Sequence, residues 1–234
     1  MKCVWEHNGS DTLLYSVDYI GAYTRGENLE AARAKMTGEI AAYAKWRGQI
    51  FDLDTDIDII QEKDCDLKIA DADSDVLFDT ERAPLSREEY EELKNLALKS
   101  ARDFYALYCS IPNKHESCLT PRKTFYGNVP TTAEQMYQHT KNVNAYYFAE
   151  INIDADNDGT IYDCRKRGFE LLESASGFLE NNVIEGSYGE LWTLRKVLRR
   201  FLWHDRIHAK AMYRMAVKTF GSFGMNNTFR FNDD

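Results

Sequence analysis

Long apolar runs are absent from the chain, although 44% of its 234 residues are hydrophobic. A membrane-spanning helix needs about 20 consecutive apolar residues, and charged residues interrupt every candidate segment. Residues 1–7 also lack the apolar stretch of a secretory signal. We therefore expect neither a membrane partner nor a secretory signal.

Cysteine is sparse and shows no pairing pattern. The chain has five cysteines, an odd number, and none forms a C-x-x-C pair. Closely spaced cysteines in even number are typical of disulfide frameworks, whereas scattered thiols are typical of proteins in a reducing compartment. The pattern therefore predicts free thiols and a cytoplasmic location.

Two common catalytic signatures are also missing. No glycine-rich phosphate-binding loop is present, and no Ser-His-Asp or Cys-His set finds support in the sequence. Cys164 precedes Arg165, and neighbouring cations lower the pKa of a thiol. No histidine lies near Cys164 in the sequence, however, so we interpret this cysteine as incidental to function.

Charge is unevenly distributed along the chain. The net charge is −9, and residues 1–85 account for it, with 9 Lys and Arg against 18 Asp and Glu, compared with 20 against 20 in the remainder. An acidic surface repels a phosphate backbone, so we expect no nucleic-acid partner. The change in charge density beside Pro84 predicts a boundary between an acidic domain, residues 1–85, and a second domain, residues 86–225.

The first domain has the pattern of a small α/β unit. The sequence pattern predicts three strands, at residues 3–7, 13–19 and 22–25. Alternating apolar residues predict two or three more, at the pairs Ile57/Ile59, Leu67/Ile69 and Val76/Phe78. Asn28 is a favourable N-cap for a helix over residues 29–46, which Gly48 ends. This order fits an antiparallel sheet with one helix packed across it.

From Ser86 onward the pattern changes to long amphipathic helices. Apolar residues recur at helical spacing over four segments, 86–111, 131–152, 160–175 and 191–220. Ser86 with Glu89 three residues later is a typical helix start. Four such helices with two long connections predict a four-helix bundle, so the expected fold class is α+β.

The last helical segment contains two histidines one turn apart. His204 and His208 lie within the apolar stripe, between Phe201 and Met212. Imidazoles at this spacing project from the same helix face and can bind one divalent metal. The opposite face carries cations that we expect to be solvated: Arg195, Lys196, Arg199, Arg206, Lys210, Arg214 and Lys218.

A third ligand is available on another helix. His139 shares its helix face with Met136 and Val143, so we expect it to be buried and to face the pair. Helical bundles hold metals through inward side chains of facing helices. The alternative is that each histidine is a core residue with one hydrogen-bond partner. Three of the five histidines on two inward faces favour the metal site.

The sequence matches two known metal-binding motifs only in part. A zincin peptidase has a Glu directly after its first histidine, whereas this chain has Asp205 and no further ligand pattern. Residues 154–159 copy the first half of an EF-hand calcium loop, but its twelfth position, which needs a bidentate carboxylate, is Arg165. We therefore expect neither a peptidase nor a calcium site.

The helical half resembles the DinB/YfiT-like superfamily of metal-dependent proteins over about residues 86–220. The matching residues are M-Y-Q-H-T at 136–140 and R-F-L-W-H-D-R-I-H at 200–208. The resemblance implies that His139, His204 and His208 bind zinc or nickel. It also implies a homodimer and, as in some members, transfer of a low-molecular-weight thiol to a small electrophile.

The first 50 residues resemble a HicB-like domain, through G-E-N-L-E-A-A at residues 26–32 after a strand hairpin. The resemblance implies a domain that blocks a small protein toxin. Because no DNA-binding extension is evident, we interpret this part as an accessory domain or a substrate lid.

Two functions remain open. In the first, the chain is an enzyme in which the metal activates a thiol, and Asp205, Tyr137 or Tyr147 orients the reacting group of a small-molecule substrate. In the second, the metal is structural or vestigial and the acidic N-terminal surface binds a protein. An open coordination position separates them, because four protein ligands close a structural zinc site.

Overall fold

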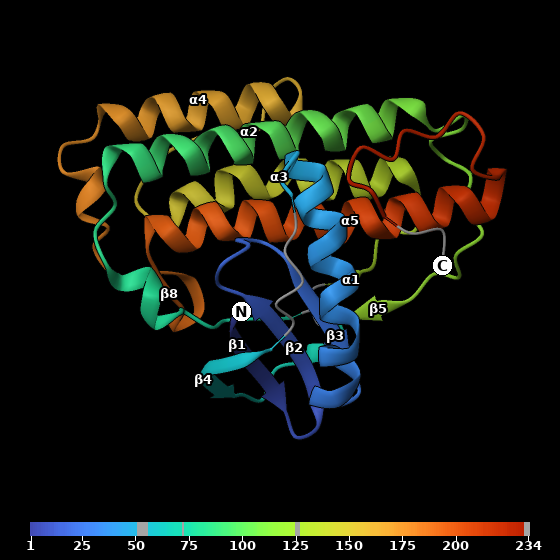
Figure 1. The fold of residues 1–234 in the computed structure, drawn as a ribbon. Helices are drawn as coiled ribbons and strands as arrows, with labels where there is room; N and C mark the ends of the chain where they lie inside the picture. Colours follow the sequence, from blue (N-terminus) through green and yellow to red (C-terminus); the bar gives the residue numbers. More distant parts are fainter. Residues whose placement is uncertain (51–55, 72, 125–126, 232–234) are drawn as a thin grey trace.

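The chain folds into an N-terminal sheet with one helix, followed by a group of long helices (Figure 1). The computed structural model describes residues 1–50, 56–71, 73–124 and 127–231. Within these ranges no helix is both long enough and apolar enough to cross a membrane. The predicted mixed class, with a sheet and one helix first and the other helices after them, is confirmed.

The sheet contains both antiparallel and parallel pairs. Its strands are β1 (Lys2–Asn8), β2 (Asp11–Ser16), β3 (Tyr23–Gly26) and β4 (Asp58–Asp64), in the spatial order β3-β2-β1-β4. The β1–β2 and β2–β3 pairs are antiparallel, but β4 pairs parallel to β1. The prediction of an antiparallel sheet is therefore wrong. The chain passes through a crossover helix before β4 and so enters the sheet again in the same direction as β1.

The predicted strands after residue 60 do not form in the described part of the chain. Ile69 lies in the 3₁₀ segment η1 (Ile69–Asp71), and Val76 and Phe78 lie outside any strand, before η2 (Asp79–Arg82). All three side chains are buried in one cluster with Trp203. Their apolar spacing therefore reflects burial against the last helix, not strand pairing.

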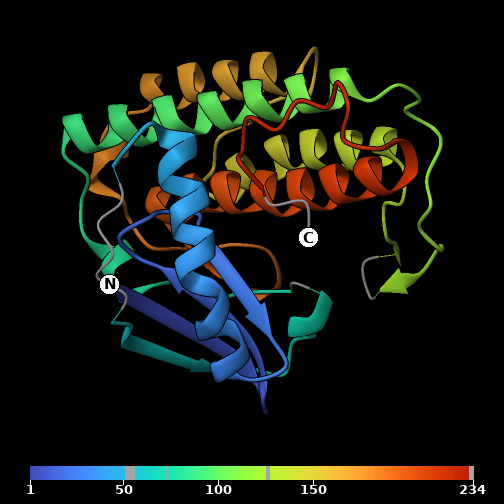
Figure 2. The same ribbon diagram turned by 45° about the vertical axis from the view of Figure 1, so that its right-hand side comes forward.

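Helix α1 (Leu29–Arg47) packs across the sheet, as predicted (Figure 2). The Asn28 side chain accepts a hydrogen bond from the Ala31 backbone N–H and caps the helix start. Gly48 ends the helix in the left-handed region, with φ of 71°. The buried side of α1 packs against β2 and β3.

The long helices are α2 (Arg87–Ser110), α3 (Ala133–Ala149), α4 (Ile161–Ser174) and α5 (Leu194–Phe220). Each begins at a Ser or Thr whose hydroxyl accepts a backbone N–H. They lie side by side, and α2 and α3 each pack against both α4 and α5.

The connections between the helices contain short paired and 3₁₀ segments. The paired segments are β5 (Lys123–Thr124), β6 (Gly127–Asn128), β7 (Ile184–Glu185) and β8 (Leu191–Trp192). The 3₁₀ segments are η3 (Phe178–Glu180) and η4 (Ser187–Gly189). Because β8 occupies the predicted start of the last helix, α5 begins three residues later than expected.

Helix α5 lies between the other helices and the sheet. On the sheet side Trp203 packs against Tyr15 and Tyr23, with ring centroids 6.0 and 6.1 Å apart. Gly21 approaches α5 so closely that a Cβ atom there would lie 2.5 Å from Leu202 Cβ, so the contact requires glycine. One hydrophobic cluster combines residues from both sides of position 85. The domain boundary at residue 85 stays a prediction.

The cations of α5 are not uniformly solvated, so that part of the prediction is wrong. Three of them are at most 2% exposed and form ion pairs: Lys196 with Glu190, Arg199 with Glu81, and Arg206 with Glu39. Two of these three carboxylates belong to the acidic N-terminal part, which packs on this face of α5. Arg214 and Lys218 are exposed, as predicted. The excess acid of the first 85 residues therefore partly compensates buried cations of the last helix.

Glu39 is the acidic centre of one such contact. Burial opposes its ionisation, but the charges of Arg206 and Lys210 outweigh this effect and hold the pKa of Glu39 below its ordinary value. Both cations also donate hydrogen bonds to its carboxylate. The carboxylate is therefore charged in the folded protein at neutral pH.

Glu39→Gln is expected to lower the free energy of unfolding by about 3–5 kcal/mol at neutral pH, because it leaves buried Arg206 without its anion. Urea unfolding followed by circular dichroism measures this change. Glu92→Gln is the matched control, since it removes the exposed partner of Arg47 and should change the stability by less than about 1 kcal/mol. Equal effects of the two variants would contradict the importance of the buried pair.

The contribution of Glu39 should also depend on pH. Because the pKa of Glu39 is lowered on folding, the unfolded chain takes up this proton first as the pH falls. The stability difference between the wild type and Glu39→Gln should therefore be complete well above pH 4.5, the ordinary value, and should decline below it. A difference that grows on acidification would refute the ion-pair assignment.

Candidate metal centre

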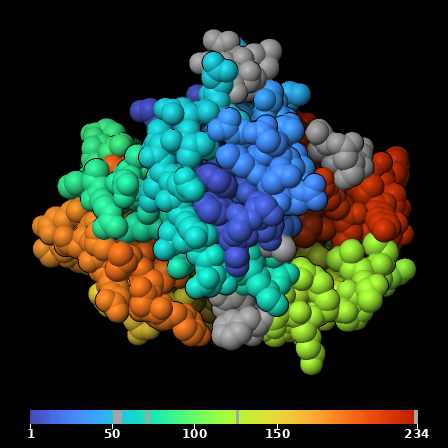
Figure 3. Space-filling model, turned by 90° about the horizontal axis from the view of Figure 1, so that it is seen from below, coloured from blue at the N-terminus to red at the C-terminus, as the bar shows by residue number. Residues whose placement is uncertain are grey.

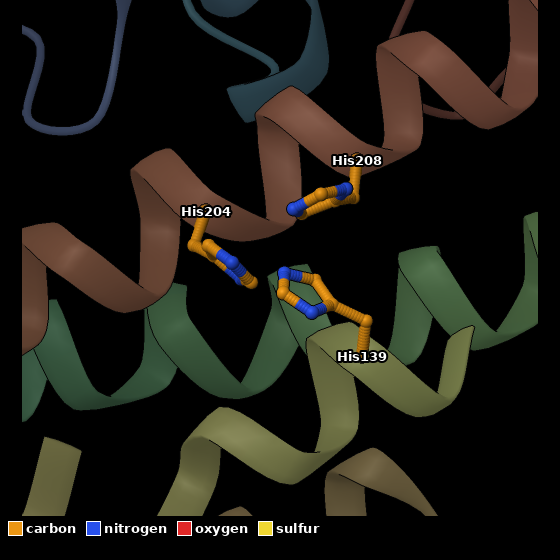
Figure 4. A group of neighbouring side chains, drawn as sticks. All are labelled: His139, His204 and His208. Carbon is orange, nitrogen blue, oxygen red and sulfur yellow. The ribbon is translucent and has the colours of Figure 1, made fainter. Parts of the chain in front are cut away.

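Three histidines from two neighbouring helices meet at one point (Figure 4). His204 and His208 lie one turn apart on α5, so their rings project from the same face. His139 lies on α3, which packs along α5. The structure therefore brings together all three residues that the sequence suggested as metal ligands.

The spacing of the imidazoles suits a single ion. The ring centroids are 4.4 Å apart for His204 and His208, and those of His139 lie 5.1 and 4.6 Å from them. One nitrogen from each ring lies within 4.8 Å of the others. A zinc–nitrogen bond is about 2.1 Å long, so the nitrogens are close to the separations that ligands of one ion have.

The cluster is buried on the α5 side and open at α3. His204 is 8% exposed, His208 is half-buried, and His139 is exposed. The prediction that His139 is buried is therefore wrong, and its exposure gives the cluster an open side. His204 Nδ1 is buried and has no hydrogen-bond partner among the described residues. A buried nitrogen of this kind fits a metal ligand better than a core histidine with a satisfied ring.

The environment of the rings favours the neutral form that a metal requires. Burial, and next the neighbouring His139, lower the pKa of His208 to about 3. Burial also holds the pKa of His204 well below 6.5, and the other two imidazoles contribute in the same direction. Desolvation lowers the pKa of His139 as well. Because metals bind deprotonated imidazole, the three nitrogens are available to a metal at neutral pH.

Histidine is the sole ligand type in this cluster, within the residues that the structure describes. Three neutral imidazoles leave the charge of a bound dication uncompensated, which favours an anion as a further ligand. The five cysteines form no disulfide. Burial raises the pKa of Cys164, so its basic neighbours do not activate this thiol.

Asp205 follows His204 in the sequence but is engaged elsewhere. Its carboxylate accepts hydrogen bonds of 2.5 and 3.0 Å from Arg165 on α4, and neither side chain is exposed. The structure therefore does not bring Asp205 into the histidine cluster, and its carboxylate ties α5 to α4.

Sequence reasoning missed the role of Arg165. This residue lies one turn from both Ile161 and Phe169, inside the buried face of α4. A cation at such a position needs a buried anion as its partner. The place of Arg165 among the apolar residues of this helix face was the feature of the sequence that could have indicated its role. Arg165 also donates to the Ala97 carbonyl on α2, so it links three helices.

The two tyrosines considered as orienting groups differ in position. Tyr147 is buried on α3 and lies edge-on to His204, with ring centroids 6.0 Å apart. Burial raises the pKa of Tyr147 to about 12, so its hydroxyl keeps the proton it can donate. Tyr137 instead stacks on Tyr108 at 4.3 Å and accepts a hydrogen bond from the Ile161 backbone N–H. Of the two, Tyr147 lies beside the cluster.

No family model matches the chain, and neither a curated protein nor a solved structure shows significant similarity to it. The resemblances to DinB/YfiT-like and HicB-like proteins therefore stay predictions from the sequence. The candidate metal site depends on the geometry of the three histidines alone.

The protein is expected to contain about one zinc or nickel ion per chain when it is purified without chelator or a nickel column. His204→Gln should weaken metal binding by more than about 100-fold, because losing a residue that merely supports a ligand already costs 10- to 100-fold. Metal analysis, followed by competition with a chromogenic chelator, measures both effects.

His115→Gln is the matched control, since His115 is exposed and lies outside the cluster. Its metal content and affinity should equal those of the wild type. If His204→Gln bound metal as tightly as His115→Gln, the three histidines would not be the ligands.

Proposed function

We propose that α2–α5 form a four-helix bundle of the DinB/YfiT-like type and that the protein is a metal-dependent enzyme. The convergence of His139, His204 and His208 supports this proposal, because helical bundles hold metals through side chains of facing helices. In this proposal the three imidazoles bind zinc or nickel. At least one coordination position is then left for water or substrate.

The proposed reaction is transfer of a low-molecular-weight thiol to a small electrophile. When bound, the metal lowers the pKa of a coordinating thiol and stabilises the thiolate. The thiol proton passes to solvent, the sulfur forms a bond to an electrophilic carbon, and the leaving group departs with the electron pair of the broken bond.

The surroundings of the cluster support this chemistry. The exposure of His139 provides a side from which substrates can approach. The uncompensated charge of a metal on three neutral ligands favours an anionic thiolate over a neutral thiol. Tyr147 lies beside His204 with its hydroxyl protonated, so it is the residue we propose to orient the electrophile.

The second candidate function is a protein-binding module with a structural or vestigial metal. The observation in its favour is β4, an edge strand whose exposed positions include Asp58, Glu62 and Asp64. An edge strand offers unpaired backbone groups to an added strand. The carboxylates would select a partner of basic charge.

Metal-loaded protein is expected to consume a thiol in the presence of a suitable electrophile. A screen that pairs several cellular thiols with several electrophiles, with and without zinc or nickel, measures the loss of free thiol. His208→Gln should reduce the metal-dependent rate by at least about 100-fold, because activation of the thiol depends on the metal. His115→Gln should retain the rate of the wild type.

Tyr147→Phe refines the same test. Loss of its hydroxyl should lower kcat by about tenfold, the effect of one orienting hydrogen bond, and should leave the metal content unchanged. If no pair of substrates shows metal-dependent turnover, while the protein binds metal and a basic peptide adds to the sheet, the binding-module function replaces the enzyme.

A further inference from the structure

A cleft of about 460 Å³ lies between β3, α1 and α5, away from the histidines. Its volume is typical of small-molecule sites. On α5 the cleft residue Lys210 follows His208 by two positions, about 200° around the helix axis. The cleft and the metal centre therefore open on different faces of the same helix. Figure 3 shows the molecule from the sheet side, where the blue N-terminal segments lie beside the red C-terminal part.

The shape of the cleft follows from the sequence of α1. Ala34, Gly38 and Ala42 recur every four residues and so lie along one stripe of this helix. A Cβ atom at Gly38 would meet no atom within 4 Å. The stripe therefore leaves free space where longer side chains would fill it.

The lining of the cleft is cationic. Its charged groups, among the described residues, are four cations and one carboxylate: Arg25, Lys35, Lys210, Arg214 and Glu39. The carboxylate already binds Arg206 and Lys210. The described lining of the cleft therefore has three more cations than carboxylates, whereas the whole chain has a net charge of −9. A cleft lined by charges of one sign attracts ligands of the opposite sign.

A buried guanidinium adds positive charge next to this lining. Arg206 is 1% exposed, and neither of its Nη atoms has a hydrogen-bond partner among the described residues. Its Cζ atom lies 5.1 Å from the centroid of the Phe231 ring, which lines the cleft. A bound anion would place negative charge beside this guanidinium and beside the cations that line the cleft.

We propose that this cleft binds a small polyanion, a molecule that carries two or more phosphate or carboxylate groups. The planar fork of Arg and the point charge of Lys are the donors that proteins use for such oxyanions. Lys35 donates to the Arg25 backbone carbonyl, which holds its ammonium at the cleft. The acidic surface contributed by the rest of residues 1–85 disfavours an extended nucleic acid.

Isothermal titration calorimetry at low salt tests the proposal, with pyrophosphate and citrate as probes and with the chelator-treated chain of residues 1–234. At least one probe should bind, and the tighter of the two identifies phosphate or carboxylate as the preferred group. Lys35→Gln and Arg214→Gln should each weaken binding about tenfold or more, as for the loss of one charge-assisted hydrogen bond. Both residues are exposed, so we expect the variants to fold, which thermal unfolding checks.

Lys218→Gln is the matched control, because it removes the same charge from α5 one turn beyond Arg214, outside the cleft. It should leave probe binding unchanged, and equal weakening would reveal general charge attraction and overturn the site. His139→Gln should also retain probe binding; loss there would place the anion at the metal centre. Failure of both probes to bind, or tighter binding of a single-stranded oligonucleotide, would overturn the proposal and leave the metal-dependent function untouched.

Discussion

Buried ion pairs around α5 are the constraint on which the rest of the structure depends. Three of these pairs are the most completely buried: Arg199 with Glu81, Arg206 with Glu39, and Asp205 with Arg165. Breaking any of them would leave a charge buried without its partner, at a cost that far exceeds that of a surface pair. The helix is therefore held at one rotation about its axis, between the sheet on one side and α4 on the other. That rotation directs His204 and His208 toward α3.

The histidine cluster and the cationic cleft are two consequences of this arrangement. On the side of α5 that faces α3, desolvation lowers the pKa of all three imidazoles, and a dication bound there would have no anionic ligand from the described residues of the cluster. On the sheet side, the cations of α5 outnumber the carboxylates that α1 supplies. The proposed ligands of both sites are therefore negatively charged, although the net charge of the whole chain is negative.

The two sites on α5 differ in the chemistry that their side chains can support. The histidine cluster offers coordination chemistry, because its donors are neutral nitrogens with an open side at His139. The cleft offers hydrogen-bond donors and fixed charge, which bind an anion without activating it. Gly21 and Trp203 join the sheet to α5 directly beside His204. The N-terminal part is thus a structural neighbour of the histidine cluster.

Much of the local structure could be predicted from the sequence, because its causes are local. The caps at Asn28 and Ser86 are formed by side chains that contact their own helix. The four-residue spacing of His204 and His208 places both rings on one face of any helix that contains them. This spacing, together with a third histidine on a helix segment with an apolar pattern, was enough to propose the three metal ligands.

The sequence by itself determined the helices, the caps at Asn28 and Ser86 and the placement of two histidines on one helix face, since these depend on residues within a few positions of one another. The tertiary structure alone decided that β4 runs parallel to β1, that Arg199 and Arg206 are buried, and that Asp205 pairs with Arg165. Periodicity shows which helix face is apolar, but it does not show what packs on the opposite face. The partner of that face comes from residues more than 100 positions away, so only the folded chain brings the opposite charges together.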